Sequence, residues 1–224
     1  MLRALTILLL LYPLTLLAQA PQRIASMNVC VDQLLLQLVA RERIASLSYL
    51  AIDPVYSALA AEAAGLPLNR GLAEEIITLH PDLVLTGPFS ASQAANLLAR
   101  QGYPVTRLGF VASIDDAMQQ ILQVGALTDT LDQATALTTR LQTGMRASQT
   151  RLQPVLAGHT AIFFSNNGVV YGSGTLQDSF LHSLGMHNVA ADAGLTGPGQ
   201  LALETVIAAA PDFIFSHPGA TLDQ

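Results

Sequence analysis

Short apolar runs alternate with longer amphipathic segments along most of this chain. The runs at 23–26, 44–47, 83–85 and 105–108 have the length and composition of buried β-strands, and helical segments lie between them. This alternation predicts an α/β fold built from βα units, with a mainly parallel sheet. Ligands of such sheets bind beyond the carboxyl ends of the strands. We therefore expect a binding rim formed by the loops that follow the strands: Met27-Asn28, Ser48-Tyr49, Gly87-Pro88-Phe89 and Gly109-Phe110.

One combination of elements occurs twice. Glu74 stands seven positions before Pro81-Asp82, and Glu204 stands seven positions before Pro211-Asp212. In both copies the residues between are mostly apolar or small and a β-rich run follows, which indicates a short helix, stopped by proline, that leads into a buried strand. A unit repeated once at long distance predicts two similarly built lobes, because a solenoid needs a short period repeated several times. An ordinary α/β protein that carries these elements twice is the alternative, and the matched glutamate spacing favours two lobes.

The segment between the two copies has helical periodicity from Ser113 to about Pro154, and only Gly125 and Gly144 are expected to interrupt it. Roughly 25 residues of unbroken helix would span about 37 Å. This length is large for a crossover within a small domain, so we predict a single long helix that joins two lobes. A pair of helices packed inside one domain is the alternative interpretation.

These patterns divide the chain into four regions. We expect a signal peptide at 1–20, an N-terminal α/β lobe at 21–112, helices that include the joining helix at 113–154, and a C-terminal α/β lobe at 155–224. The last region shows only two clear strand patterns, so we expect this lobe to be truncated.

The N-terminal segment has the pattern of a secretory signal. Arg3 precedes an apolar run at 4–17, and Ala18-Gln19-Ala20 has the small-residue form of a cleavage site. The run is too short to span a membrane comfortably, so we predict cleavage after Ala20 and export to the periplasm. An uncleaved membrane anchor is the alternative. Because no cysteine stands at the cleavage site, we expect a soluble protein rather than a lipoprotein.

Composition and charge exclude several functions. The chain has a formal net charge of −6, and its ten basic residues are all arginine. It offers no basic patch to a nucleic acid, and without lysine it cannot form the phosphate-binding loop of an ATPase. The single cysteine, Cys30, cannot form an internal disulfide, and we expect it to be a small buried residue at the start of a helix.

The sequence contains neither of two common hydrolase motifs. It has no G-x-S-x-G elbow, and its five histidines do not have the spacing that zinc hydrolases use. We therefore predict no catalytic residues, no metal ligands and no cofactor. Two alternatives stay open: a receptor that chelates zinc or manganese with His, Asp or Glu from both lobes, and an exported enzyme without a recognised motif.

Several stretches, taken in order, resemble one known family. They are Ile24–Asp32, Asn69-Arg70-Gly71 with Glu74, Pro81–Val84, and Gly185 with Asn188-Val189-Ala190. Over about residues 22–217 the chain resembles the periplasmic substrate-binding proteins of ABC importers for vitamin B12, ferric siderophores and haem. The resemblance implies a receptor that performs no chemistry, holds an iron chelate, haem or cobalamin between its lobes, and delivers it to an inner-membrane permease. We expect this receptor to be a monomer.

The resemblance also implies roles for individual residues. One glutamate on each lobe docks onto arginines of the permease, and by position these are Glu74 and Glu204. A carboxylate in the first turn of a helix can form charge-assisted bonds to a guanidinium, although Glu75 competes with its neighbour for this role. Large flat side chains suit a macrocycle, and a cation suits an anionic group. The candidate ligand contacts on these grounds are Tyr49, Phe89 and Tyr171 as ring contacts and Arg70 as the cation.

Overall fold

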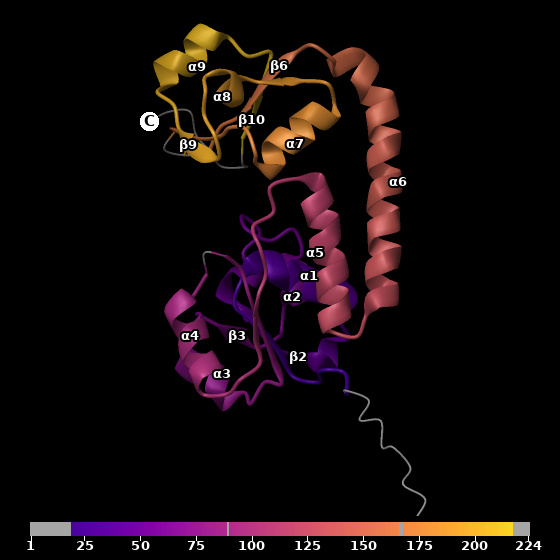
Figure 1. The fold of residues 1–224 in the computed structure, drawn as a ribbon, viewed down its shortest axis with the longest axis vertical. Helices are drawn as coiled ribbons and strands as arrows, with labels where there is room; N and C mark the ends of the chain where they lie inside the picture. Colours follow the sequence, from indigo (N-terminus) through magenta and orange to yellow (C-terminus); the bar gives the residue numbers. More distant parts are fainter. Residues whose placement is uncertain (1–18, 89, 166–167, 217–224) are drawn as a thin grey trace, which may run out of the picture.

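The computed structural model describes residues 19–88, 90–165 and 168–216. Two α/β lobes stand one above the other and are joined along one side by the long helix α6, Leu131–Leu156 (Figure 1). The two-lobed α/β fold with mainly parallel sheets, predicted from the repeated unit, is thus confirmed. Phe89 and all but the last two residues of the predicted signal segment lie outside the described residues.

The N-terminal lobe is built on a five-stranded parallel sheet with the strand order β3-β2-β1-β4-β5. Because the strands are parallel, their carboxyl ends meet at one edge of the sheet. The strands are β1 (Ile24–Ser26), β2 (Ile44–Ser48), β3 (Leu68–Asn69), β4 (Leu83–Thr86) and β5 (Val105–Arg107). The helices of this lobe are α1 (Val29–Leu38), α2 (Ala60–Ala63), α3 (Ala73–Thr78) and α4 (Ser92–Arg100), with 3₁₀ turns at Arg41–Arg43 and Tyr49–Ile52.

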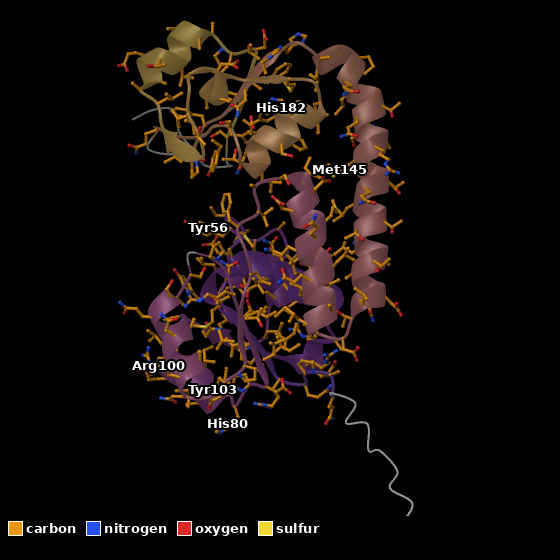
Figure 2. All side chains as sticks on the ribbon, in the orientation of Figure 1. Tyr56, His80, Arg100, Tyr103, Met145 and His182 are labelled. Carbon is orange, nitrogen blue, oxygen red and sulfur yellow. The ribbon has the colours of Figure 1, made fainter. Side chains whose placement is uncertain are left out.

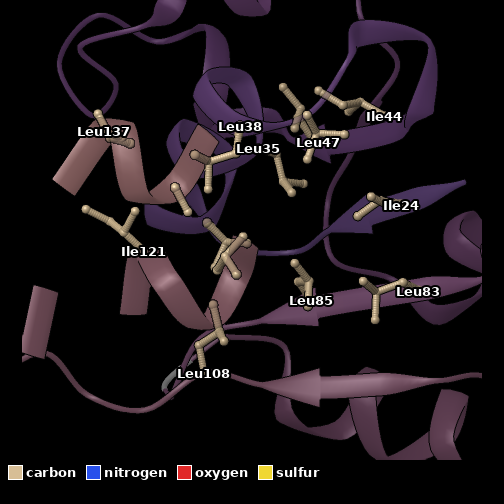
Figure 3. Close-up of a cluster of buried hydrophobic side chains, with 14 of the residues drawn as sticks. Ile24, Leu35, Leu38, Ile44, Leu47, Leu83, Leu85, Leu108, Ile121 and Leu137 are labelled. Carbon is tan, nitrogen blue, oxygen red and sulfur yellow. The ribbon is translucent and has the colours of Figure 1, made fainter. Parts of the chain in front are cut away.

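The core of the N-terminal lobe lies between the sheet and the helices α1, α5 (Ile114–Leu127) and α6. Ile24 and Leu85 extend from neighbouring strands toward Leu35 of α1, and the same cluster includes Ile121 and Leu137 (Figure 3). All of them are nearly inaccessible to solvent. Burial of a side chain of this size contributes about 1.5–3 kcal/mol. This one cluster therefore ties the start of the long helix firmly to the first lobe.

The C-terminal lobe contains two small sheets. In the first, β10, β6 and β8 pair in parallel, and in the second, β7 and β9 pair antiparallel. Its strands are β6 (Thr160–Phe163), β7 (Val169–Tyr171), β8 (His187–Asn188), β9 (Pro198–Gln200) and β10 (Phe213–Phe215). Its helices are α7 (Leu176–Ser183), α8 (Val189–Asp192) and α9 (Leu203–Ala209). The described part of the lobe thus holds more strands than the two that the apolar pattern indicated.

The predicted helix breaks at Gly125 and Gly144 were wrong. Helix α5 (Ile114–Leu127) contains Gly125, and the chain reverses at 128–130 instead, where Asp129 has a φ of +55°. Gly144 lies inside the uninterrupted α6. Gly125 is required for packing, because a Cβ atom there would collide with the Cβ of Ala134 on α6. Neither glycine therefore ends a helix. Gly125 marks a close contact between α5 and α6, and Gly144 lies inside an unbroken helix.

Within the described part of the chain, a long helix and a hydrogen-bonded contact both connect the lobes. The first is α6, whose middle part is mostly exposed between the end packed on the N-terminal lobe and the end packed on the C-terminal lobe (Figures 1 and 2). The second lies at the start of α5, which Ser113 caps by accepting a hydrogen bond from the N–H of Asp116 at 3.0 Å. There the N–H of Ile114 donates to Oγ of Ser179 on α7 at 3.2 Å. Within the described residues, this helix and this polar contact therefore both join the two lobes.

Candidate ligand-binding cavity and docking surface

A cavity of about 300 Å³ lies between the two lobes. The N-terminal lobe contributes the loops after β1, β4 and β5, and the C-terminal lobe contributes the end of β7, the start of α7 and part of β9. This is the position expected for a site beyond the carboxyl ends of parallel strands. The lining consists of Asn28, Cys30, Val31, Gly87, Pro88, Leu108, Gly109, Phe110, Val111, Gln120, Tyr171, Thr175, Leu176, Gln177 and Pro198.

Asn28 organises the wall of the N-terminal lobe. Its Oδ1 accepts hydrogen bonds from the N–H groups of Cys30 and Val31, at 3.0 and 3.3 Å, and so begins helix α1 as its capping side chain. Its Nδ2 donates to Oγ of Ser90 at 2.6 Å. A Cβ atom on Gly87 would come within 2.6 Å of this Nδ2, so only glycine lets the loop after β4 approach so closely. Asn28, which belongs to the predicted rim, thus joins the loop after β1 to the loop after β4.

Thr175 has the same capping role on the wall of the C-terminal lobe. Its Oγ1 accepts a hydrogen bond from the N–H of Asp178 at 3.2 Å and donates to the carbonyl of Gly172 at 2.8 Å. Asp178 is buried and accepts from Nδ2 of Asn188 at 2.9 Å, and that same Nδ2 donates to the carbonyl of Tyr171. This network fixes β7 against the start of α7, and it holds the residues of that first turn at the cavity.

Of the four predicted ligand contacts, the structure places Tyr171 on the cavity wall. Tyr49 and Arg70 follow β2 and β3 at the correct edge of the sheet, but neither lines the cavity, and both are exposed. They stand on the side of the sheet remote from β5, whereas the cavity is lined by the loops after β1, β4 and β5. Phe89 lies outside the described residues.

Sequence reasoning did not select Phe110, Gln120 and Gln177, although all three line the cavity. A signal existed for Phe110, which belongs to the predicted rim and is 50% exposed. No comparable signal marked the two glutamines. Gln120 lies on α5 and Gln177 in the first turn of α7, and only the packing of the two helices reveals which of their faces meets the cavity.

The expectation for Cys30 was wrong. The residue begins helix α1, as predicted, but it is exposed and lines the cavity instead of being buried. Residues 27–31 turn from the strand into the helix at the rim, and the buried positions of this turn fall to Met27 and Val31. Atoms packed around the thiol, and then the negative charge of Asp32, raise the pKa of Cys30 above its ordinary value of 9.0. The thiol is therefore neutral at physiological pH.

Asp32 is a buried carboxyl group directly behind the cavity wall. It accepts hydrogen bonds from the N–H of Ser48 at 3.2 Å and from the hydroxyl of the same residue, which ties α1 to the end of β2. Burial raises the pKa of Asp32 from 3.8 to about 6, against the opposing effect of hydrogen bonds from Ser26 and Ser48. Its exposure to solvent is zero, so it serves the structure of the wall and not contact with a ligand.

The two glutamates predicted to dock are both exposed and both lie in the first turn of a helix, Glu74 on α3 and Glu204 on α9. Within the described part of the chain, no hydrogen bond or ion pair engages either side chain. Glu75 differs, because its carboxylate accepts the N–H of Arg70 at 2.6 Å. Both helices lie on the side of the molecule away from α6 (Figure 1). The structure thus leaves the carboxylates of Glu74 and Glu204, one on each lobe, without a partner among the described residues.

A broad groove of about 740 Å³ adjoins Glu74. It lies between the start of α3 and helix α4, and Leu72, Leu97 and Arg100 also line it. Arg100 and His80 belong to the part of the N-terminal lobe that is distant from the other lobe (Figure 2). This groove is therefore separate from the cavity between the lobes.

Two further observations concern the described residues alone. The described residues contain no group of three or more His, Cys, Asp and Glu side chains that could hold a metal ion. Across the same residues, no helix combines the length and the apolar character that crossing a membrane requires.

The fold and the cavity together define a two-lobed ligand-binding protein. The chain belongs to the periplasmic binding protein family, whose model matches residues 24–224. This is a family of binding proteins and not of enzymes. A search of curated protein sequences gives no match.

Solved structures share the fold. A possible iron-binding periplasmic protein from Staphylococcus epidermidis has a TM-score of 0.74 and 21% identity over 88% of this chain and 78% of that chain. The periplasmic heme-binding protein RhuT from Roseiflexus sp. RS-1 has a TM-score of 0.74 and 23% identity over 87% of this chain and 76% of that chain. The vitamin B12-binding protein BtuF of Vibrio cholerae has a TM-score of 0.69 and 17% identity over 88% of this chain and 76% of that chain. At these identities the likeness establishes the fold alone.

Proposed function

We propose that this protein is a periplasmic receptor that binds an iron chelate, haem or cobalamin between its lobes and delivers it to an ABC importer. The observation that carries the proposal is the cavity between the lobes, because both lobes supply its walls. Structures with the same fold are described as iron-, heme- and vitamin B12-binding proteins, which supports this class of ligand. The segment 1–20 is proposed to direct export and to be removed after Ala20, and the receptor acts as a monomer.

Docking onto the permease is assigned to Glu74 and Glu204. Each is exposed, and each stands in the first turn of a helix without a partner among the described residues. A free carboxylate in this setting can accept two parallel hydrogen bonds from an arginine of the permease. The groove beside Glu74 offers room for the segment that carries such an arginine. Glu75 is excluded from this role because it is bound to the backbone at Arg70.

The binding part of the proposal is tested by calorimetric titration of the mature protein. The ligands are cyanocobalamin, haem and a ferric trihydroxamate siderophore. Saturable binding of one of them, with a dissociation constant in the micromolar range or below, is the expected result. Folded protein that binds none of the three would contradict the proposal.

The docking part is tested with the double variant Glu74→Ala with Glu204→Ala. We expect uptake by the importer to be abolished while ligand affinity stays unchanged, because neither residue lines the cavity. The matched control is Glu62→Ala with Asp192→Ala, which removes one exposed carboxylate from each lobe at other helices. Loss of ligand affinity in the first variant, or equal loss of uptake in the control, would refute the docking assignment.

A further inference from the structure

The described side chains that line the cavity between the lobes carry no charge. Among the described residues that line it there is no Arg, His, Asp or Glu, and the chain contains no Lys. The thiol of Cys30 adds no charge either, because its surroundings disfavour the thiolate. The described side chains of the wall therefore offer a ligand apolar surface, amides, hydroxyls and a neutral thiol.

The polar side chains of the wall fall into two groups. Asn28 and Thr175 use their polar atoms to cap α1 and α7, so they hold the wall together. Gln120 donates through Nε2 to the carbonyl of Gly109 at 2.9 Å, which leaves its own carbonyl oxygen available. The side chains of Tyr171 and Gln177 make no hydrogen bond within the described part of the chain. Among the described side chains, the amide of Gln177, the amide oxygen of Gln120, the phenol of Tyr171 and the thiol of Cys30 are thus left for recognition.

Among the described residues, the charged groups close to the cavity do not line it. Asp32 lies behind the wall, with no exposure to solvent. Arg70 follows β3, at the opposite edge of the sheet from β5, and is not part of the lining. A carboxylate held against this wall would therefore exchange water for side chains that supply no cation, which is unfavourable. The net charge of −6 adds long-range repulsion of anions.

We propose that the cavity selects an uncharged metal complex whose periphery carries amide or hydroxamate groups, and that it discriminates against a porphyrin dicarboxylate. This inference rests on the proposed function and narrows it. Corrinoids with amide side chains and neutral ferric trihydroxamates share the required chemistry: carbonyl oxygens for the donors of Gln177 and Tyr171, and N–H groups for the oxygen of Gln120. The apolar part of the wall, including Leu108 and Leu176, contacts the hydrocarbon of either ligand.

The first test compares three ligands by calorimetry under one buffer and salt condition. Cyanocobalamin and an uncharged ferric trihydroxamate represent the two sources of the proposed chemistry, and haem represents the dicarboxylate. At least one neutral ligand is expected to bind ten-fold or more tightly than haem. Whichever of cyanocobalamin and the ferric trihydroxamate binds more tightly shows which class of neutral complex the cavity takes. Tighter binding of haem than of both neutral ligands would overturn the inference while leaving the receptor function intact. Silence from all three would overturn the receptor function and the inference with it.

A second test changes the charge of the wall at Gln177. Its variant Gln177→Arg places a guanidinium on the cavity, and we expect haem affinity to rise at least ten-fold while affinity for the neutral ligand falls several-fold. Gln177→Met is the matched control of similar length without charge, and it should weaken the neutral ligand without improving haem. Thermal unfolding of both variants shows whether the fold is kept. An unchanged ratio of haem to neutral-ligand affinity in a folded Gln177→Arg protein would contradict the proposed selection by charge.

Discussion

The carboxylate of Asp212 accepts hydrogen bonds from both the N–H and the hydroxyl of Thr160, at 2.8 and 3.0 Å. Thr160 is the first residue of β6, the strand that pairs with β10. In the other lobe, Asp82 accepts from the N–H groups of Gln22 and Arg23, just before β1, which pairs with β4. The repeated Pro-Asp pair therefore has one structural purpose in both lobes: its aspartate binds the backbone where the neighbouring strand begins.

The substitution Asp82→Asn tests this contact between the aspartate and the backbone. The two oxygens of Asp82 each accept one N–H, at 2.6 and 2.8 Å, so an amide would turn its NH₂ toward one of these donors. We expect a loss of about 1 kcal/mol in the free energy of unfolding, measured with urea. Asp53→Asn is the control. The side chain of Asp53 accepts one hydrogen bond, from the backbone N–H of Val55, and the amide oxygen of an asparagine can still accept it. Equal losses in both variants would show that the paired geometry does not matter.

Acid should weaken the corresponding contact between Asp212 and Thr160 in the C-terminal lobe. Hydrogen bonds from the N–H and then the hydroxyl of Thr160 lower the pKa of Asp212 below its ordinary value of 3.8. A group whose pKa is lower in the folded protein stabilises the fold above its unfolded pKa, and this contribution disappears as the pH falls through the folded pKa. Thr160→Val removes the hydroxyl donor, so an NMR titration should show a higher pKa for Asp212. An unchanged titration would contradict the role of the hydroxyl.

Asp32 should make stability depend on pH in the opposite direction. Its folded pKa of about 6 exceeds the ordinary 3.8, so between these values the unfolded chain releases a proton that the folded protein retains. Stability from this group is fully present below pH 3.8 and is lost as the pH rises through about 6. Asp32→Asn keeps an acceptor for the N–H of Ser48 and cannot ionise. Relative to the parent, the variant should gain up to about 3 kcal/mol at pH 7 and little at pH 4.

Urea unfolding of both proteins at several pH values between 4 and 7 measures this difference. A stability difference that stays constant over the range would contradict a protonation of Asp32 coupled to folding. A variant that is less stable at every pH would show that the carboxylate is well solvated or better paired than its geometry indicates.

Two glycines of the long helices should respond oppositely to alanine. At Gly125 an added Cβ collides with Ala134, so Gly125→Ala should destabilise the protein by about 1–3 kcal/mol despite the better helix propensity of alanine. At Gly144 an added Cβ meets nothing within 4 Å, so Gly144→Ala should stabilise it by about 0.5–1 kcal/mol. Thermal or urea unfolding measures both. Gly125→Ala combined with Ala134→Gly should recover part of the loss, and failure to do so would place the strain elsewhere.

Cys30 offers a direct probe of the cavity. As the chain's single cysteine it reacts specifically, and its raised pKa predicts slow labelling by a maleimide at pH 7 that accelerates as the pH rises. Because the residue lines the cavity, a bound ligand should slow the reaction several-fold, and a completed label should block ligand binding. Mass spectrometry measures the rate. The same rate with and without a ligand that saturates the protein would show that the ligand binds outside this cavity.

The sequence predicted the features that depend on local pattern. The apolar runs predicted the parallel sheet, the repeated glutamate and Pro-Asp spacing predicted the two lobes, and the helical periodicity after Ser113 predicted the joining helix. The chain reversal at 128–130 escaped notice because it contains neither glycine nor proline, and Asp129 adopts the left-handed conformation there. The glycine at 125, which appeared to end a helix, belongs instead to the contact between α5 and α6.

The site was less predictable because it depends on how the lobes are placed. Tyr49 and Arg70 occupy the predicted edge of the sheet, yet the C-terminal lobe covers the other part of that edge. The contributions of Gln120 and Gln177 come from helix faces that only tertiary packing orients. Periodicity in the sequence identifies which residues avoid the core, but it does not tell which of them meet a second lobe.

The exposed middle of α6 has a consequence for the rate at which a ligand is captured. With the lobes held apart by one continuous helix and linked by the contact from Ile114 to Ser179, their separation is maintained before any ligand arrives. Capture then requires little rearrangement, so association should proceed without a slow closing step, and differences between ligands should appear mainly in how long each one stays bound. If the proposed docking holds, release to a permease would come from bending this single helix, with force applied at the two distant carboxylates of Glu74 and Glu204.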